Sequence, residues 1–171
     1  MSADPFARLM SEPLPAGAVA GGSAPVPLDI IFINGFVGET VIGIHQDELY
    51  RPQPVRVDLA AGVPRSLACD TDRIGDTIDY SVVREALREM LATHSFQLLE
   101  AFAEAVATLL LTRFNAQWVR VGVTKPRKFD DVEGVGVIIE RSRPQRARRG
   151  SDSAEVLSLL GAGMVPGSPL R

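Results

Sequence analysis

The amino-acid sequence predicts an α+β domain in which two strands are followed by two helices and then by two more strands. Residues 28–64 contain two apolar, β-branched segments, residues 80–114 contain two segments with helical periodicity, and residues 118–143 return to the strand pattern. Because strands and helices are grouped rather than alternating, we expect a four-stranded antiparallel sheet with both helices packed on one face.

The first two strands are expected around residues 28–38 and 54–63. The segment 28–38 is apolar and β-branched, and the dipeptide Asn34-Gly35 within it is a turn signal. In the second segment Val55, Val57 and Leu59 alternate with other residues, so their side chains should share one face of the sheet. A polar loop between the two segments carries the sequence HQDELYRPQ.

The two helices follow a loop rich in aspartate. The first is predicted over residues 80–94, where apolar residues recur at helical spacing. Its buried positions are Val83, Leu87, Met90 and Leu91. Ser95 is a plausible N-cap for the second helix, over residues 96–114. The buried stripe of that helix should contain Leu99, Phe102, Val106, Leu109 and Leu110. The segments 118–126 and 135–143 then complete the sheet.

Composition places the chain among globular proteins and argues against several functions. The 171 residues are 46% hydrophobic, with a formal net charge of -3, whereas nucleic-acid binders usually carry a basic excess. A single cysteine, Cys69, cannot form an intramolecular disulfide and fits a reducing compartment. Apolar runs are too short to cross a membrane, and Asp4 and Glu12 do not suit a secretory signal. We therefore expect a cytoplasmic protein.

The two ends of the chain differ from its middle. Residues 1–27 are rich in Ala, Gly, Pro and Ser and are predicted to be a disordered arm, and residues 144–171 are predicted to be a flexible tail. The folded domain is therefore expected at 28–143. A basic cluster near the tail could contact RNA or phospholipid, although basic linkers are usually just solvated; it comprises Arg143, Arg146, Arg148 and Arg149.

Four polar residues lie at the ends of predicted elements, where functional side chains tend to be carried: Glu48, Tyr80, Glu100 and Lys125. Each has an ordinary structural explanation when taken alone. Glu48 can be a surface acid beside Asp47, Tyr80 can pack at a helix start, Glu100 suits the positive end of a helix dipole, and Lys125 can be a solvated strand end. The chain offers no convincing zinc ligand set, so no metal is expected.

The sequence segments that contain these four polar residues indicate a function when they are taken together. These segments are IGIHQDELYRPQPVRVDL, DTIDYSVV, FQLLEAFAEAVA, and VRVGVTKPRKF followed by GVGVIIER. In their order and spacing they resemble dihydroneopterin aldolase over about two-thirds of the chain. The compact members of that family lack terminal segments as long as those of this chain. The resemblance implies the tunnelling fold and a homotetramer or homo-octamer with active sites between adjacent subunits.

The resemblance also implies a reaction. The family is a lyase that cleaves 7,8-dihydroneopterin by a retro-aldol step into 6-hydroxymethyl-7,8-dihydropterin and glycolaldehyde, in folate biosynthesis. The pterin itself accepts the electron pair through its C6=N5 imine, so that neither a cofactor nor a metal is expected.

Three catalytic roles follow from the resemblance. Lys125 matches the lysine that works with water in proton transfer at N5 and at the side-chain hydroxyl. Tyr80, from a neighbouring subunit, matches the residue that protonates the enol intermediate. Glu48 matches an acid that contacts the trihydroxypropyl chain and ordered water.

Substrate binding is assigned in the same way. Glu100 matches the carboxylate that accepts two N–H donors from the pterin ring. The backbone at Leu99 and at Ile78 should lie beside the ring, and Gln53 should support the loop that carries Glu48. His45 occupies a variable position near the substrate tail. We expect His94 to be a structural residue at the helix junction.

Two other functions remain open at this point. One is an epimerase acting at C2′ of dihydroneopterin or its triphosphate, for which Arg127 and Lys128 supply basic residues near Lys125. The other is a non-catalytic pterin-binding ring, which needs Glu100 but has no evident use for Lys125.

Overall fold

The computed structural model of the chain describes residues 28–143. The predicted disordered arm at 1–27 and flexible tail at 144–171 lie outside the described residues, and so do three arginines of the basic cluster. Within the described part, no helix is long and apolar enough to cross a membrane.

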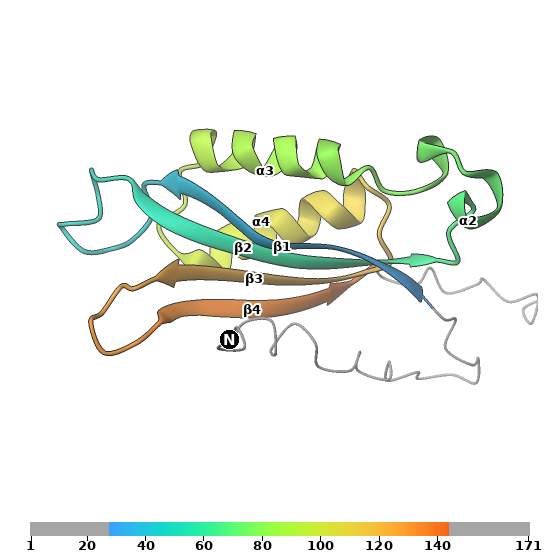
Figure 1. Cartoon of the computed structure of the whole chain (residues 1–171). Coiled ribbons are helices and arrows are strands. Elements are labelled where there is room, and N and C mark those ends of the chain that lie inside the picture. Colours follow the sequence, from blue (N-terminus) through green and yellow to red (C-terminus); the bar gives the residue numbers. More distant parts are fainter. Residues whose placement is uncertain (1–27, 144–171) are drawn as a thin grey trace, which may run out of the picture.

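Four strands form one antiparallel sheet in the order β1-β2-β3-β4, and two long helices cover one of its faces (Figure 1). The strands are β1 (Leu28–Thr40), β2 (Gln53–Pro64), β3 (Trp118–Pro126) and β4 (Gly134–Ser142). The helices are α3 (Tyr80–Thr93) and α4 (Leu99–Thr112). This arrangement confirms the predicted α+β class. The aspartate-rich loop additionally contains the short helix α2 (Ala68–Thr71) and the 3₁₀ turn η1 (Ile74–Asp76).

The Asn34-Gly35 dipeptide forms a bulge inside β1 and does not end the strand. The pairing register moves from Ile33 opposite Leu59 to Phe36 opposite Val57, so two residues of β1 face one residue of β2. Gly35 adopts a positive φ of 68°, which favours glycine. Its amide donates a 2.6 Å hydrogen bond to the Asp58 carboxylate.

The core lies between the sheet and the two helices. Val55, Val57 and Leu59 of β2 are almost fully buried on the helix side, as their alternation predicted. Most of the predicted stripe of each helix also faces this core, but Leu109 does not belong to it and Leu111 packs against it instead. The buried members of the stripes are Val83, Leu87 and Leu91 of α3 and Phe102, Val106 and Leu110 of α4.

The two helices begin differently. Asp79 caps α3 because its carboxylate accepts a 2.8 Å hydrogen bond from the Ser81 amide. The predicted Ser95 cap of the second helix is wrong: α4 begins at Leu99, after the extended residue Leu98, which makes no side-chain capping bond. The cause lies just upstream, where the His94 ring accepts the Phe96 amide hydrogen and holds the connection out of helical geometry.

Candidate active site

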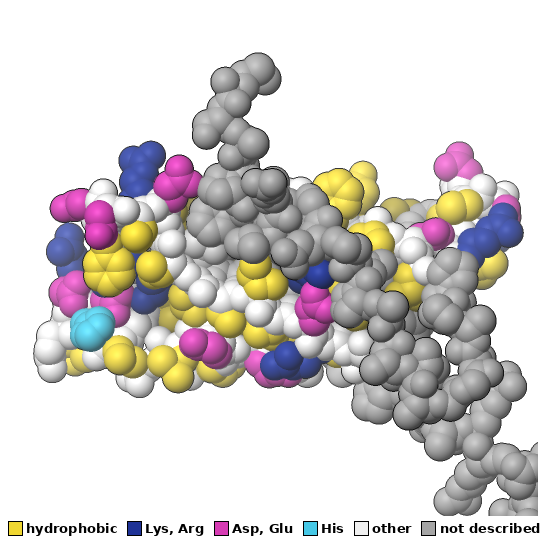
Figure 2. Space-filling model, turned by 90° about the horizontal axis from the view of Figure 1, so that it is seen from below, with side chains coloured by type: hydrophobic (Ala, Val, Ile, Leu, Met, Phe, Trp, Pro, Cys, Tyr) yellow, Lys and Arg dark blue, Asp and Glu magenta, His cyan; other side chains and the backbone are white. Residues whose placement is uncertain are grey.

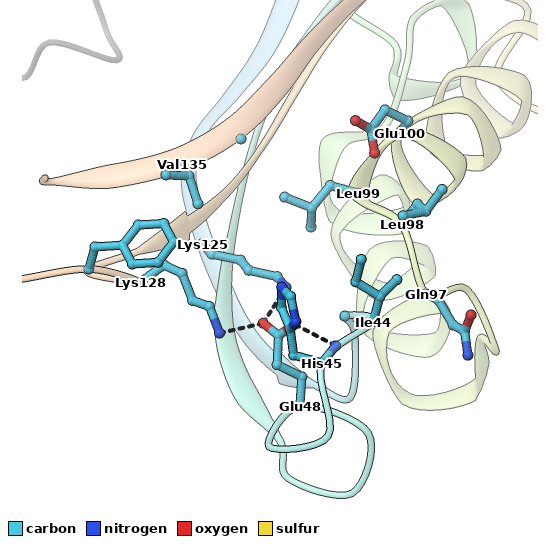
Figure 3. Close-up of a pocket in the computed structure, with 13 residues that line it drawn as sticks. Ile44, His45, Glu48, Gln97, Leu98, Leu99, Glu100, Lys125, Lys128 and Val135 are labelled. Atoms are coloured by element: carbon cyan, nitrogen blue, oxygen red, sulfur yellow. Dashed lines mark hydrogen bonds and ion pairs between the residues drawn. The ribbon is translucent and has the colours of Figure 1, made fainter.

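A pocket of about 270 Å³ opens between the end of the sheet and the first turn of α4 (Figure 3). Three segments that are distant in sequence supply its walls: the β1–β2 loop, the α3–α4 connection with the first turn of α4, and the β3–β4 hairpin. The residues that line it include Gly43, Glu48, Leu99, Glu100, Lys125 and Lys128.

Strand alternation places Lys125 in this pocket. It continues the face of β3 on which Val121 and Val123 are fully buried, so its side chain points toward the helices. β3 ends at Pro126, one residue later. Lys125 is only 8% exposed, and its ammonium group therefore needs a partner inside the pocket.

Glu48 is that partner, and it is shared. The Glu48 carboxylate is 4% exposed. One of its oxygens, Oε1, lies 2.8 Å from Lys125 Nζ and 2.7 Å from Lys128 Nζ. Gln53 Nε2 donates to the same oxygen at 3.3 Å and also to the Ile42 carbonyl, so it fixes the loop that carries Glu48. Glu48 and Lys125, which the sequence singled out separately, thus contact each other directly, and Gln53 supports Glu48.

These contacts set the charge of the carboxylate. Burial alone would raise the pKa of Glu48, but hydrogen bonds from Lys125, Lys128 and Gln53 outweigh it and hold the pKa far below its ordinary value. The hydrogen bond to Glu48 in turn raises the pKa of Lys128. Glu48 is therefore an anion, and Lys128 a cation, at any physiological pH.

Gly43 allows the carboxylate to lie where it does. Its φ is +146°, a backbone conformation that other residues rarely adopt. A Cβ atom at this position would overlap the Glu48 carboxylate. The His45 amide, two residues further, donates a 3.4 Å hydrogen bond to the other Glu48 oxygen. His45 itself lines the pocket.

Glu100 lies on the opposite wall, in the first turn of α4 (Figure 3). Its side chain is exposed, and within the described part of the chain it makes no hydrogen bond or ion pair. No side chain caps the amides at this end of α4, so both the carboxylate and the helix N-terminus are available to a ligand. Leu99 lines the pocket beside it.

His94 connects the end of β1 to the α3–α4 connection through hydrogen bonds of its ring. The Thr40 hydroxyl donates its hydrogen to the Leu91 carbonyl at 2.7 Å and therefore accepts one from His94 Nε2, also at 2.7 Å. The other ring nitrogen accepts the Phe96 amide hydrogen at 3.1 Å. The neutral ring satisfies both contacts, and burial lowers the pKa of His94 accordingly. Its expected structural role at the helix junction matches these contacts.

Two predicted site residues lie elsewhere. Tyr80 is the first residue of α3 and is 63% exposed. α3 begins at the end of the sheet opposite the β1–β2 loop and the β3–β4 hairpin, which line the pocket (Figure 1). Ile78, two residues earlier, is 5% exposed and belongs to the core. Neither lines the pocket of its own chain.

The sequence places Lys128 near Lys125 but does not predict its contact with Glu48. The hairpin reverses at Arg127, whose φ is +50°, and returns Lys128 over Glu48. Arg127 instead lines a separate cavity with Arg56 and Thr124. Among the residues that the structure describes, no three His, Cys, Asp or Glu side chains are grouped so as to hold a metal ion.

Known proteins share this sequence and fold. A family model described as dihydroneopterin aldolase matches residues 31–140. Dihydroneopterin aldolase of Escherichia coli K12 is 35% identical over 114 residues, which cover 67% of this chain and 93% of that protein. A more distant relative, a dihydroneopterin triphosphate 2′-epimerase of Pseudomonas aeruginosa, is 24% identical over 104 residues, which cover 61% of this chain and 85% of that protein.

Solved structures agree. A putative dihydroneopterin aldolase of Vibrio cholerae superposes with a TM-score of 0.65 at 37% identity, over 68% of this chain and 99% of that one. The E. coli enzyme in complex with neopterin superposes with a TM-score of 0.64 at 35% identity, over 67% of this chain and 99% of that one. The predicted tunnelling fold is thereby confirmed. On the family model, the sequence identity and the shared fold together, this chain belongs to the dihydroneopterin aldolase family.

Proposed function

We propose that this chain is the aldolase of folate biosynthesis that cleaves 7,8-dihydroneopterin into 6-hydroxymethyl-7,8-dihydropterin and glycolaldehyde, using Lys125, Glu48 and Tyr80. The observation that carries the assignment to these residues is the buried Lys125–Glu48 pair on one wall of a pocket whose other wall presents the unpaired Glu100. A site that only bound pterins would have no evident use for a buried lysine.

The residues at the start of α4 bind the pterin ring. The Glu100 carboxylate accepts two parallel N–H donors from the amino-pyrimidinone edge of the pterin, an arrangement that gives orientation as well as affinity. Backbone groups at Leu99 add contacts to the ring. The pterin side chain then reaches across the pocket toward Glu48 and Lys125.

The chemistry is proton transfer around one breaking bond. The Lys125 ammonium gives a proton to N5 and, through water, takes the proton of the C2′ hydroxyl as the C1′–C2′ bond breaks and releases glycolaldehyde. The bonding electron pair passes into the C6=N5 imine, whose nitrogen carries the proton from Lys125. Tyr80 then protonates the resulting enol at C1′, and the N5 proton returns through water to Tyr80, which restores the imine and gives the hydroxymethyl product. Glu48 holds Lys125 and the side-chain hydroxyls in place.

Tyr80 and Ile78 complete the site from a neighbouring copy of the chain. Their position opposite the pocket supports this, because one chain carries both halves of the site at its two ends (Figure 1). Within the described chain, β1 and β4 each pair on one side only, and an open edge invites pairing with another strand. A homotetramer or a homo-octamer satisfies both conditions. The exposed free thiol of Cys69 fits a cytoplasmic setting.

The charge at the side-chain end of the pocket supports a neutral triol over a triphosphate as substrate. Lys125 and Lys128 are balanced there by Glu48 and by Asp47, which lies 3.7 Å from Lys128. Figure 2 shows basic and acidic side chains mixed at this end of the molecule. A triphosphate tail would call for an excess of cations, so the triphosphate epimerase is less well supported.

A product assay tests the proposal. The full-length protein is incubated with 7,8-dihydroneopterin and EDTA, and the pterins are separated by chromatography. We expect 6-hydroxymethyl-7,8-dihydropterin and glycolaldehyde in equal amounts. The C2′ epimer as sole product would favour the epimerase, and neither product from a folded, oligomeric sample would refute the proposal.

A further inference from the structure

The two lysines of this chain meet at one carboxylate. The 18 basic residues of the sequence divide into 16 arginines and 2 lysines, Lys125 and Lys128. Both ammonium groups lie within 2.8 Å of Glu48 Oε1, whereas the cations of every other region of the chain are arginines. The resemblance to known aldolases gives Lys125 a role and leaves Lys128 without one.

We infer that Lys128 is a positioning residue of the aldolase site, which holds Glu48 ionised and in place while Lys125 exchanges its proton with the substrate. The inference rests on the proposed function, since it concerns the step in which Lys125 acts.

The reason is the cost of a buried, unpaired charge. Glu48 is 4% exposed, so a Lys125 that moves away or gives up its proton would leave an anion without a counter-ion. Lys128 is already hydrogen-bonded to the same oxygen at 2.7 Å. With Lys128 present, the carboxylate keeps one cationic partner throughout the reaction, and Lys125 is free to turn toward the substrate.

Lysine suits this position better than arginine. An ammonium group is a compact charge on a flexible stem, so two of them can share one carboxylate oxygen, whereas a guanidinium favours both oxygens at once. The Lys128 side chain is 20% exposed, and Asp47 lies on its outer side. Its pKa is raised by the hydrogen bond to Glu48, which keeps Lys128 protonated while Lys125 changes state.

The Lys128→Met substitution removes the charge and keeps the stem. We expect kcat to fall by about tenfold or more. The acid limb of its pH profile should move to higher pH, because Glu48 loses one of the hydrogen bonds that lower its pKa. The dissociation constant for neopterin should change little, since the ring binds at Glu100. Lys128→Arg, which keeps the charge but not the compact ammonium group, should recover only part of the turnover. Arg127→Gln, in the same turn but lining another cavity, is the control and should behave as wild type.

A second measurement tests the pairing without any turnover. With lysine labelled at Nζ, the protein gives two ammonium signals in an NMR titration, and Lys128→Met assigns them. Glu48→Gln should return the pKa of Lys128 toward its ordinary value of 10.5. A Lys128 signal that is indifferent to Glu48→Gln would overturn the inference.

The outcomes separate the two proposals. If the wild-type protein is active and Lys128→Met has the same kcat and pH profile, this inference is overturned and the proposed function stands. No turnover by the wild-type protein would overturn the proposed function and this inference with it.

Discussion

The two ends of the molecule carry functional residues in opposite states. At the pocket end, Glu48 and Lys125 are buried and form an ion pair with each other. At the other end, the side chains of Tyr80, Leu67 and Ile74 are all exposed, and Tyr80 is 63% exposed. The first end is organised within one chain, and the second presents an exposed, partly apolar surface.

The difference teaches that a single chain builds only part of the site. The pocket end can bind a ring and hold a proton-transfer pair, but it lacks the acid that the proposed reaction needs for the enol. The opposite end carries that acid with nothing beside it to act on. Substitutions at each end show how far that end works by itself.

The largest effect is expected from Lys125→Met. This change removes the group that exchanges protons with the substrate and leaves Glu48 paired with Lys128, so the fold should survive. We expect kcat to fall by a factor of about 10² to 10⁴, with little change in neopterin affinity. Steady-state kinetics and a binding titration measure the two quantities separately. An equal loss of binding and turnover would contradict the assigned role.

Glu100→Gln should weaken binding instead. Loss of a charged acceptor costs about 1.5–3 kcal/mol per hydrogen bond, which corresponds to about a tenfold to hundredfold rise in the dissociation constant for neopterin. Glu104→Gln is the matched control, because Glu104 lies one turn further along α4 and pairs with Arg141 at 2.7 Å. Equal affinities for the two variants would show that the pterin does not bind at the start of α4.

A smaller, pH-dependent effect is expected at His94. Burial lowers its pKa in the folded chain, whereas the unfolded chain takes up a proton near the ordinary value of 6.5. The stability contributed by the neutral ring is therefore present above pH 6.5 and is lost as the pH falls toward the folded pKa. Urea unfolding at one protein concentration, above and below this pH, measures the change.

Thr40→Val sharpens that experiment, since it removes the hydroxyl that accepts from His94 and keeps the shape of the side chain. We expect it to cost about 1 kcal/mol at neutral pH. His94→Gln should remove most of the loss of stability just below pH 6.5. The loss at lower pH should remain, because Glu48 also has a lowered pKa and contributes below its ordinary value of 4.5. A His94→Gln profile identical to wild type would contradict the role of the ring.

Periodicity was sufficient to predict the four strands and the two long helices of this fold, but not the short elements α2 and η1. The alternation of Val55, Val57 and Leu59 and the helical spacing of Val83, Leu87 and Leu91 both report which face is buried, and burial dominates folding. Local signals were less dependable. Asn34-Gly35 is a bulge because β1 pairs with β2 both before and after this dipeptide, and Ser95 does not cap α4 because the His94 ring already binds the Phe96 amide.

The site was predictable only in part. The resemblance supplied Glu48, Glu100 and Lys125, and the structure brings these residues to the walls of one pocket. It could not supply Lys128, whose contact depends on the reversal of the chain at Arg127. The place of Tyr80 could be expected from the resemblance alone, since no pattern along one chain reports which surface meets a neighbouring copy.

Subunit complementation tests most directly whether each active site is built from residues of two neighbouring chains. Lys125→Met and Tyr80→Phe are each purified and assayed, then mixed, dissociated and reassembled. If each site takes its lysine from one chain and its tyrosine from a neighbour, two nearly inactive proteins should together recover about one quarter of the wild-type activity, because a random mixture restores both residues at that fraction of sites. A mixture no more active than its components would show that lysine and tyrosine act within one chain and would contradict this account.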